Sequence, residues 1–110
     1  MTTRTPDHIL DEIRATRGDL LRGPDAVRDL EVAAERAEDA AQLAFDAVLM
    51  QAEGSIPEKQ AQARAGSVEE RDAAFIARAQ YNRARAKIRG LEAALVSLQA
   101  ELRYAREMGA

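Results

Sequence analysis

The sequence predicts an all-α fold: a long antiparallel helical hairpin, or coiled coil, with a short N-terminal helix, which assembles into a multi-helix bundle. Of the 110 residues, 24 are alanine and only four are Phe or Tyr, with no Trp, so a thick globular core is hard to build. Two stretches repeat small or apolar residues at alternating intervals of three and four, which is the heptad pattern of a coiled coil. A glycine-serine pair separates the two stretches and indicates a turn.

The first helix is expected at about residues 6–21. Thr5 suits the N-cap, and Pro6 suits the first helical position, where no backbone N–H is needed. The Gly23-Pro24 pair is expected to break or kink the chain, because proline lacks the N–H that an interior helical residue donates. A second helix then starts at Pro24 and extends to about residue 53. The apolar stripe of the first helix consists of Ile9, Leu10, Ile13 and Leu20.

The second helix carries the first heptad seam. Gly54 follows this helix as a stop signal, and Ser55 is a candidate N-cap for the next one. The seam is thin, because most of its members are alanine. They are Val27, Leu30, Ala34, Ala37, Ala41, Ala44 and Val48.

A third helix is expected at about residues 57–107, with Gly66 as the position where it could break. Ser67 and Glu70 form a capping box, which predicts a fresh helix start there. The alternative is one helix that tolerates Gly66 at a cost of about 1 kcal/mol. We expect residues 1–110 to form one domain. The second seam consists of Ala74, Ala77, Tyr81, Ala84, Ile88, Leu91, Leu95, Leu98, Leu102 and Ala105.

The two seams differ in length, which raises the question of what covers the leucine-rich end of the second. A turn near residue 55 pairs Val27 with Ala84, so everything after Ala84 overhangs. If the chain only kinks at Gly23-Pro24, the N-terminal helix fills the overhang and Ile9 meets Leu102; if the chain reverses, another chain must fill it. Even a filled pair leaves the leucines partly wet, which predicts self-association. The expected interface with another copy or a partner is Ile88, Leu91, Leu95, Leu98 and Leu102.

Charge is unevenly distributed along the chain, with a net −6 in residues 1–53 and +3 in residues 54–110. Intramolecular pairing of the two halves explains this difference, and it places Arg78 near residues 33–35 and Arg71 near residues 39–40. The alternative is contact with nucleic acid, because a row of arginines can follow phosphates while an aromatic ring stacks on a base. The candidate nucleic-acid contacts are Arg64, Arg71, Arg78, Arg85, Arg89 and Tyr81.

No catalytic or metal site is expected. His8 is the only histidine, and one imidazole beside the surface carboxylate of Glu12 makes a poor metal site. There is no cysteine, no nucleophile beside a base and no glycine-rich phosphate loop. No stretch approaches the roughly 18 apolar residues of a membrane span. We therefore expect a non-enzymatic protein without cofactor, small-molecule substrate or membrane contact.

Residues 54–107 show a resemblance to a known group. Gly54, Glu58-Lys59, Tyr81, Lys87, Leu91-Glu92 and Leu98-Gln99 occur in the order seen in small helical proteins from the early, replication and recombination, regions of tailed bacteriophages. Members of that group often carry Ser after the Leu-Gln pair, where this chain has Ala100. The resemblance implies an accessory or host-directed protein that works in the cytoplasm of the bacterial host, with a bacterial or phage protein as its partner.

The size and hairpin shape are also similar to the WXG family of secreted helical hairpins. The turn Glu53-Gly54-Ser55 lacks the family's Trp, and Tyr104 and Glu107 are one residue too close together for its export motif. The leading hypothesis is therefore a coiled-coil protein that works through protein–protein contacts, with nucleic-acid binding and a WXG-like secreted hairpin as alternatives.

Overall fold

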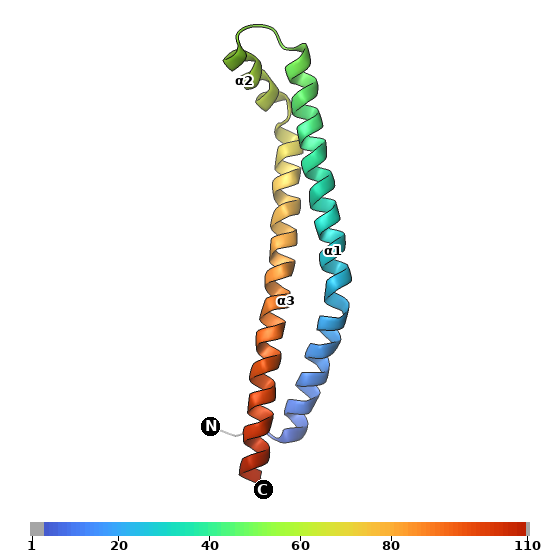
Figure 1. Cartoon of the computed structure of the whole chain (residues 1–110), viewed down its shortest axis with the longest axis vertical. Helices are drawn as coiled ribbons and strands as arrows, with labels where there is room; N and C mark the ends of the chain where they lie inside the picture. Colours follow the sequence, from blue (N-terminus) through green and yellow to red (C-terminus); the bar gives the residue numbers. More distant parts are fainter. Residues whose placement is uncertain (1–3, 110) are drawn as a thin grey trace. The chain divides into compact units, whose positions relative to one another are not determined.

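The computed structural model describes residues 4–109, and these form three helices (Figure 1). Helix α1 spans Pro6–Gln51, α2 spans Ile56–Gly66 and α3 spans Val68–Gly109. The described residues contain no β-strand. The all-α prediction and the antiparallel helical hairpin are confirmed.

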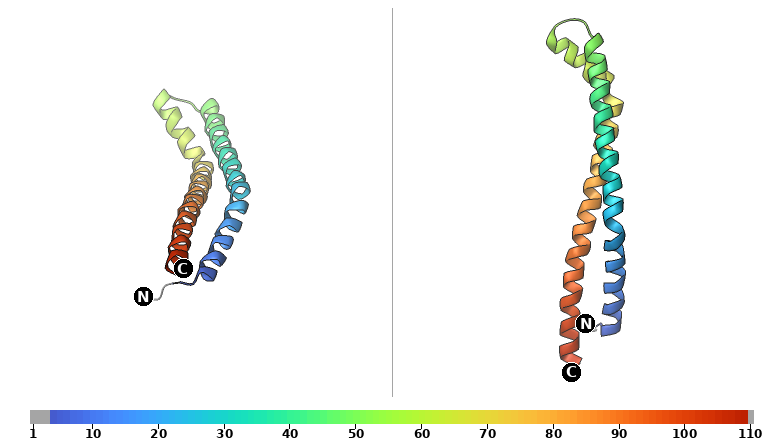
Figure 2. Two further views of the ribbon diagram at one scale, coloured as in Figure 1. Left: turned by 60° about the horizontal axis from the view of Figure 1, so that its bottom comes forward. Right: turned by 45° about the vertical axis from the view of Figure 1, so that its right-hand side comes forward.

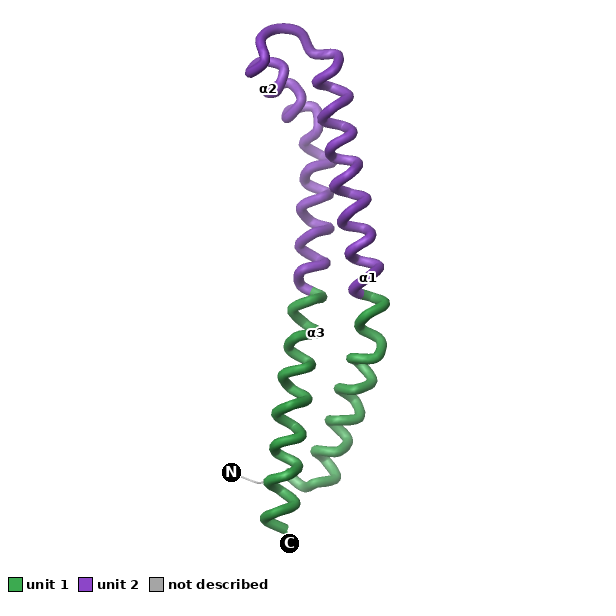
Figure 3. The backbone as a smooth tube through the Cα atoms, in the orientation of Figure 1, with its two compact units in different colours: residues 1–26, 84–110 green, residues 27–83 purple. Residues whose placement is uncertain are grey.

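Two compact units share the long helices (Figure 3). Unit 1 comprises residues 1–26 and 84–110, and unit 2 comprises residues 27–83. In each unit a segment of α1 runs antiparallel to a segment of α3, so each unit is built on a helix pair. Unit 2 also contains α2 and the turn that precedes it.

Helix α1 runs through Gly23-Pro24 without interruption, so the predicted separate helices at residues 6–21 and 24–53 are wrong. The heptad phase explains why. Gly23 lies three residues after Leu20 and four before Val27, and it therefore occupies a seam position that keeps the apolar stripe continuous. A Cβ at Gly23 would overlap Cδ1 of Ile88, which shows how closely α3 approaches there. Packing along a long seam outweighs the one hydrogen bond that Pro24 cannot donate.

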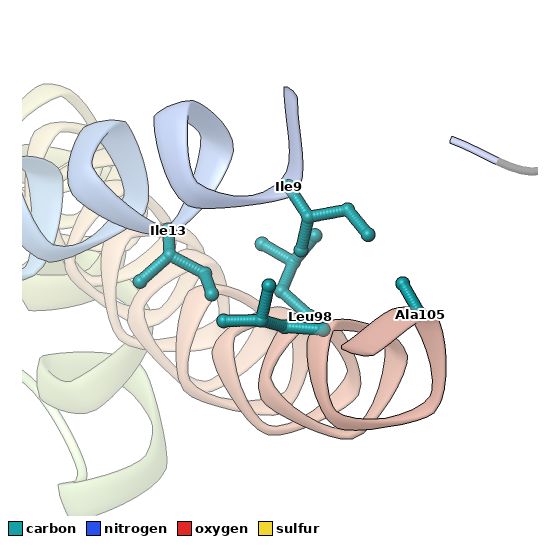
Figure 4. Packing of buried hydrophobic residues seen from close by; sticks show 5 residues of the cluster. Ile9, Ile13, Leu98 and Ala105 are labelled. Atoms are coloured by element: carbon teal, nitrogen blue, oxygen red, sulfur yellow. The ribbon is translucent and has the colours of Figure 1, made fainter. Parts of the chain in front are cut away.

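The core of unit 1 joins the start of α1 to the end of α3 (Figure 4). Ile9 is fully buried and Ile13 nearly so, and both pack against the leucines of α3. The N-terminal segment of the same chain therefore fills the leucine-rich overhang, with Ile9 beside Leu102 as the kinked alternative predicts. The cluster consists of Ile9, Ile13, Leu98, Leu102 and Ala105, with Leu10 and Leu95 partly buried against it.

Arg4 closes the end of unit 1. Its Nε donates to Glu101 Oε1 at 2.7 Å, and its guanidinium also pairs with Glu12. The hydrogen bond from Arg4 lowers the pKa of the Glu101 carboxyl below its ordinary value of 4.5. The N-terminus of α1 itself follows the prediction, because Thr5 Oγ1 accepts from the His8 N–H at 3.4 Å.

Unit 2 has a seam made mainly of alanine. Ala34, Ala41 and Ala74 are its buried members, and the other predicted seam residues of this unit are half-buried. Because alanine removes little apolar area from water, each layer contributes less stability than a leucine layer would. Both heptad seams predicted from the sequence face inward.

The turn between α1 and α2 forms as the sequence predicts, although α1 ends at Gln51 rather than at residue 53. Gly54 has a φ of 116°, in the left-handed region that favours glycine. Ser55 is the N-cap of α2, since its Oγ accepts from the Glu58 N–H at 3.3 Å. The Gln62 side chain donates to the Glu53 carbonyl at 2.9 Å and ties α2 to the turn.

The joint between α2 and α3 lies at Ser67, where the chain changes direction and α2 leans away from the line of α3 (Figure 2). A fresh helix start is confirmed there, but not through the predicted capping box. The Ser67 hydroxyl is fully buried and donates to the Ala63 carbonyl at 2.7 Å, so it caps the end of α2. Gly66 lets α1 approach closely, because a Cβ there would lie 2.7 Å from Cγ2 of Val48.

Candidate interaction surface

The five residues predicted as an oligomer interface face α1 of the same chain. Leu98 and Leu102 are only 8% and 9% exposed, because Ile9 and Ile13 cover them. The remaining three, Ile88, Leu91 and Leu95, are half-buried. Little of this leucine row is therefore left for a partner, and the exposed apolar side chains lie elsewhere.

Arg78 and Tyr81, both candidate nucleic-acid contacts, interact within unit 2. Arg78 Nε donates to Glu38 Oε2 at 3.0 Å, and the guanidinium carbon lies 5.3 Å from the centre of the Tyr81 ring. The hydrogen bond from Arg78 lowers the pKa of the Glu38 carboxyl below its ordinary value of 4.5. Arg78 bonds to Glu38, about one helical turn beyond the predicted residues 33–35, because α2 and the joint at Ser67 shift the register of unit 2. The predicted neighbourhood is nevertheless correct, since Glu38 first and Glu35 to a lesser extent raise the pKa of the Arg78 guanidinium.

The other candidate arginines do not form one uniform row. Arg64 lies on α2 and Arg71 on α3, so the break at Ser67 interrupts the seven-residue spacing. Arg71 Nη2 donates to the Arg64 carbonyl at 2.7 Å, and Arg71 lines one groove with Ala41 and Gln42, close to the predicted residues 39–40. Arg85 and Arg89 belong to unit 1, and Arg89 is exposed.

The helix pair of unit 2 has two sides of different chemistry. Glu38 and Arg78 each directly follow a seam residue, and their ion pair shows that such positions of α1 and α3 share one side. Residues that directly precede a seam residue must lie on the opposite side. The first side carries most of the charge, whereas the second has an uncharged centre. This centre is at Ala40 and Ile76, and the charged residues around it are Arg36, Glu69 and Arg83.

The charged side holds a groove of about 270 Å³. Glu38, which pairs with Arg78, lines this groove. Phe75 is 76% exposed and belongs to the same side of the helix pair. The residues that line the groove are Glu38, Ala41, Gln42, Phe45, Arg71 and Ala74.

The opposite side presents apolar side chains to solvent. Leu43 is 70% exposed and Ile76 is 56% exposed, and Met50 continues the line along α1. The alanines between them are also exposed. The sequence reasoning missed this surface because it followed only the innermost seam, although the spacing of apolar residues beside that seam carried the signal. We call Ala40, Leu43, Ala47, Ala73 and Ile76 the uncharged face.

Residues 4–109 contain no group of three or more His, Asp or Glu side chains arranged to hold a metal ion. His8 itself is exposed at the start of α1. Among the described helices, none carries an apolar stretch long enough to cross a lipid bilayer.

Comparison with family models, with curated proteins and with solved structures finds no match to this chain. Its function is therefore inferred from the surfaces described above.

Proposed function

We propose that this chain is a non-enzymatic interaction protein that works through the outer faces of its helices. The observation that supports this most is the number of large apolar side chains left in water by so small a chain. Isolated exposed apolar residues are ordinary, but clustered ones mark sites of association. Of the large exposed apolar residues in unit 2, Leu43, Met50 and Ile76 share one side of the helix pair. The full set is Leu43, Met50, Ile56, Val68, Phe75 and Ile76.

The partners proposed are a second copy and a bacterial or phage protein. The resemblance of residues 54–107 to early-region phage proteins supports an accessory or host-modulating role in the bacterial cytoplasm. A helix pair with an exposed apolar side suits this role, because a partner helix can complete the bundle.

Sedimentation of the purified chain, together with affinity capture from the bacterial host, tests the proposal. We expect association that increases with concentration, or a host protein that is retained by the wild-type chain and lost with the Leu43→Lys variant. A chain that stays monomeric at high concentration and retains no protein would remove the proposal. Leu21→Lys is the matched control, because Leu21 is 82% exposed and belongs to unit 1.

Nucleic-acid binding is the second candidate function. It is favoured by the stretch of α3 between Ala73 and Leu91, which contains no acid, and by the exposure of Arg64, Arg71 and Arg89. Electrophoretic mobility shift across salt concentrations tests it, since phosphate contacts weaken steeply as salt rises. Binding that weakens with salt and with Arg71→Ala or Arg89→Ala supports this candidate, whereas no shift at low salt excludes it.

A WXG-like secreted hairpin remains a third alternative. It predicts that the chain is exported from bacteria in a manner that depends on Tyr104, and retention of the wild-type chain inside the cell would argue against it.

A further inference from the structure

We infer that the uncharged face of unit 2 binds the same face of a second copy, with the two hairpins antiparallel and related by a two-fold axis. This inference rests on the proposed function and names its partner. Four observations carry it: the exposed area, the matching of small and large side chains, the charges at the edges of the face and the lack of charge in the five residues that define it. Arg36 also lies on this side of α1, next to Ala40 along the helix, and in the arrangement proposed it meets Leu43 of the other copy.

The exposed area is the first observation. The chain exposes 8217 Å² for a mass of 12.0 kDa. A folded monomer of this mass typically exposes about 6,000 Å². The excess is larger than the roughly 800 Å² per partner that a specific interface buries. The chain therefore exposes enough surface for a second copy to bury an interface of standard size.

The side chains of the uncharged face are suited to packing on their own kind. Ala33, Ala40 and Ala47 recur every seven residues along the same side of α1, and all three are exposed. Such a column lets two helix backbones approach closely. Leu43 and Ile76 project beside the alanines, so large side chains of one copy can fit over small side chains of the other.

The ion pair between Glu38 and Arg78 sets the register of the two helices and thereby the centre of the face. Glu38 lies level with Arg78, and α1 and α3 run in opposite directions. Ala40, two residues after Glu38, therefore lies level with Ile76, two residues before Arg78. Consider a two-fold axis at this level that lies in the plane of the face, perpendicular to the helices. It brings α3 of one copy against α3 of the other, and the two helices run in opposite directions. Ala33 and Ala47, each seven residues from Ala40, then face each other across the interface.

Charge complementarity selects this antiparallel arrangement. Glu69 and Arg83 lie on the same side of α3 as Ile76, seven residues before it and seven residues after it. In the antiparallel dimer Glu69 of each copy meets Arg83 of the other, so the contact is made twice. In a parallel dimer Glu69 would instead lie beside Ala47, and Arg83 would face Ala33 and Arg36 of the other copy.

The same features disfavour a strongly acidic or strongly basic partner. The five residues of the uncharged face carry no ionisable side chain, and the charges at its edges have opposite signs. A surface with this pattern is complementary to itself.

Analytical ultracentrifugation of the full chain and five variants tests the inference. Ile76→Lys buries two lysines in the dimer and should raise the dimer dissociation constant at least about tenfold. Phe75→Lys is the matched control: Phe75 is the neighbouring residue, is also exposed and lies on the charged side. Glu69→Arg and Arg83→Glu should each weaken the dimer several-fold, and the double variant should restore it. Circular dichroism checks that all variants keep the helix content of the wild type.

Each outcome bears on the inference. A wild-type chain that never dimerises overturns it, although capture of a host protein would leave the proposed function standing. Equal weakening by Ile76→Lys and Phe75→Lys means that the interface lies elsewhere. Loss of affinity in the double variant beyond that of either single change rules out the antiparallel contact between Glu69 and Arg83. Selective loss with Ile76→Lys and restoration by the charge exchange establish it.

Discussion

Alanine substitutions at Gly66 and Gly90 are expected to change stability in opposite directions, although both glycines are exposed and helical. A Cβ at Gly90 would have no atom within 4 Å, so the substitution removes only the conformational freedom of glycine. The expected gain in the free energy of unfolding is about 1 kcal/mol. For a chain of this size the melting temperature should rise by about 4 °C.

Gly66→Ala has a smaller intrinsic gain, because Gly66 is the last residue of α2, and the new side chain meets Val48. The new Cβ would lie 2.7 Å from Cγ2, and this atom is attached directly to Cβ of a β-branched side chain and cannot swing away. Overpacking of this kind typically costs about 1–3 kcal/mol. We therefore expect a net loss of up to about 2 kcal/mol, because the gain in helix propensity offsets part of the strain.

A double-mutant cycle separates the two terms. Val48→Ala removes both γ-carbons, so Gly66→Ala should become neutral or stabilising in that background. Urea unfolding followed by circular dichroism, at one fixed protein concentration, measures all four members of the cycle. The reasoning is refuted if Gly66→Ala stabilises the wild type as much as Gly90→Ala does, or if its effect is the same with and without Val48.

Three further predictions concern the core, the ion pair and the proline. Leu98→Ala should destabilise the chain by roughly 2–5 kcal/mol, and Leu95→Ala by less because Leu95 is only partly buried, as urea midpoints will show. The pKa of Glu38 should lie below 4.5 by NMR titration and should rise in Arg78→Met. The ion pair therefore contributes to stability above about pH 4.5, and this contribution is lost as pH falls through the lowered pKa. A Glu38 titration midpoint that is the same in Arg78→Met and in the wild type contradicts this. Pro24→Ala should stabilise the chain by up to about 3 kcal/mol, because it supplies the missing backbone donor of α1, and a lower urea midpoint would contradict that reason.

The inward faces of both long helices were predictable, because residues spaced alternately three and four apart all fall on one side of a helix. Ile9 beside Leu102 followed from the same spacing and the turn at Gly54 in one of the two alternatives, the one in which the chain does not reverse at Gly23-Pro24. Local signals were less reliable where they competed with this pattern. Gly23-Pro24 resembles a helix break in isolation, but Gly23 continues the seam and permits the contact with Ile88.

The candidate site was harder to predict than the fold. Counting residues from the turn assumes that both helices run straight into it, and α2 invalidates this assumption near residue 67. Arg78 consequently bonds to Glu38, about one helical turn beyond the predicted residues 33–35, although Glu35 is still close enough to act on its charge. Ser67 was recognised as a boundary, but the burial of its hydroxyl against Ala63 depends on tertiary packing that no local pattern encodes.

The position of the two tyrosines gives each unit its own optical probe. Tyr81 belongs to unit 2, where the Arg78 guanidinium lies over its ring, and Tyr104 belongs to unit 1, where it is 58% exposed. Since the chain has no tryptophan, a Tyr104→Phe variant emits from Tyr81 alone, and a Tyr81→Phe variant from Tyr104 alone. Comparing the two fluorescence melts would reveal whether the alanine-rich unit 2 and the leucine-rich unit 1 lose their order in one step or in succession.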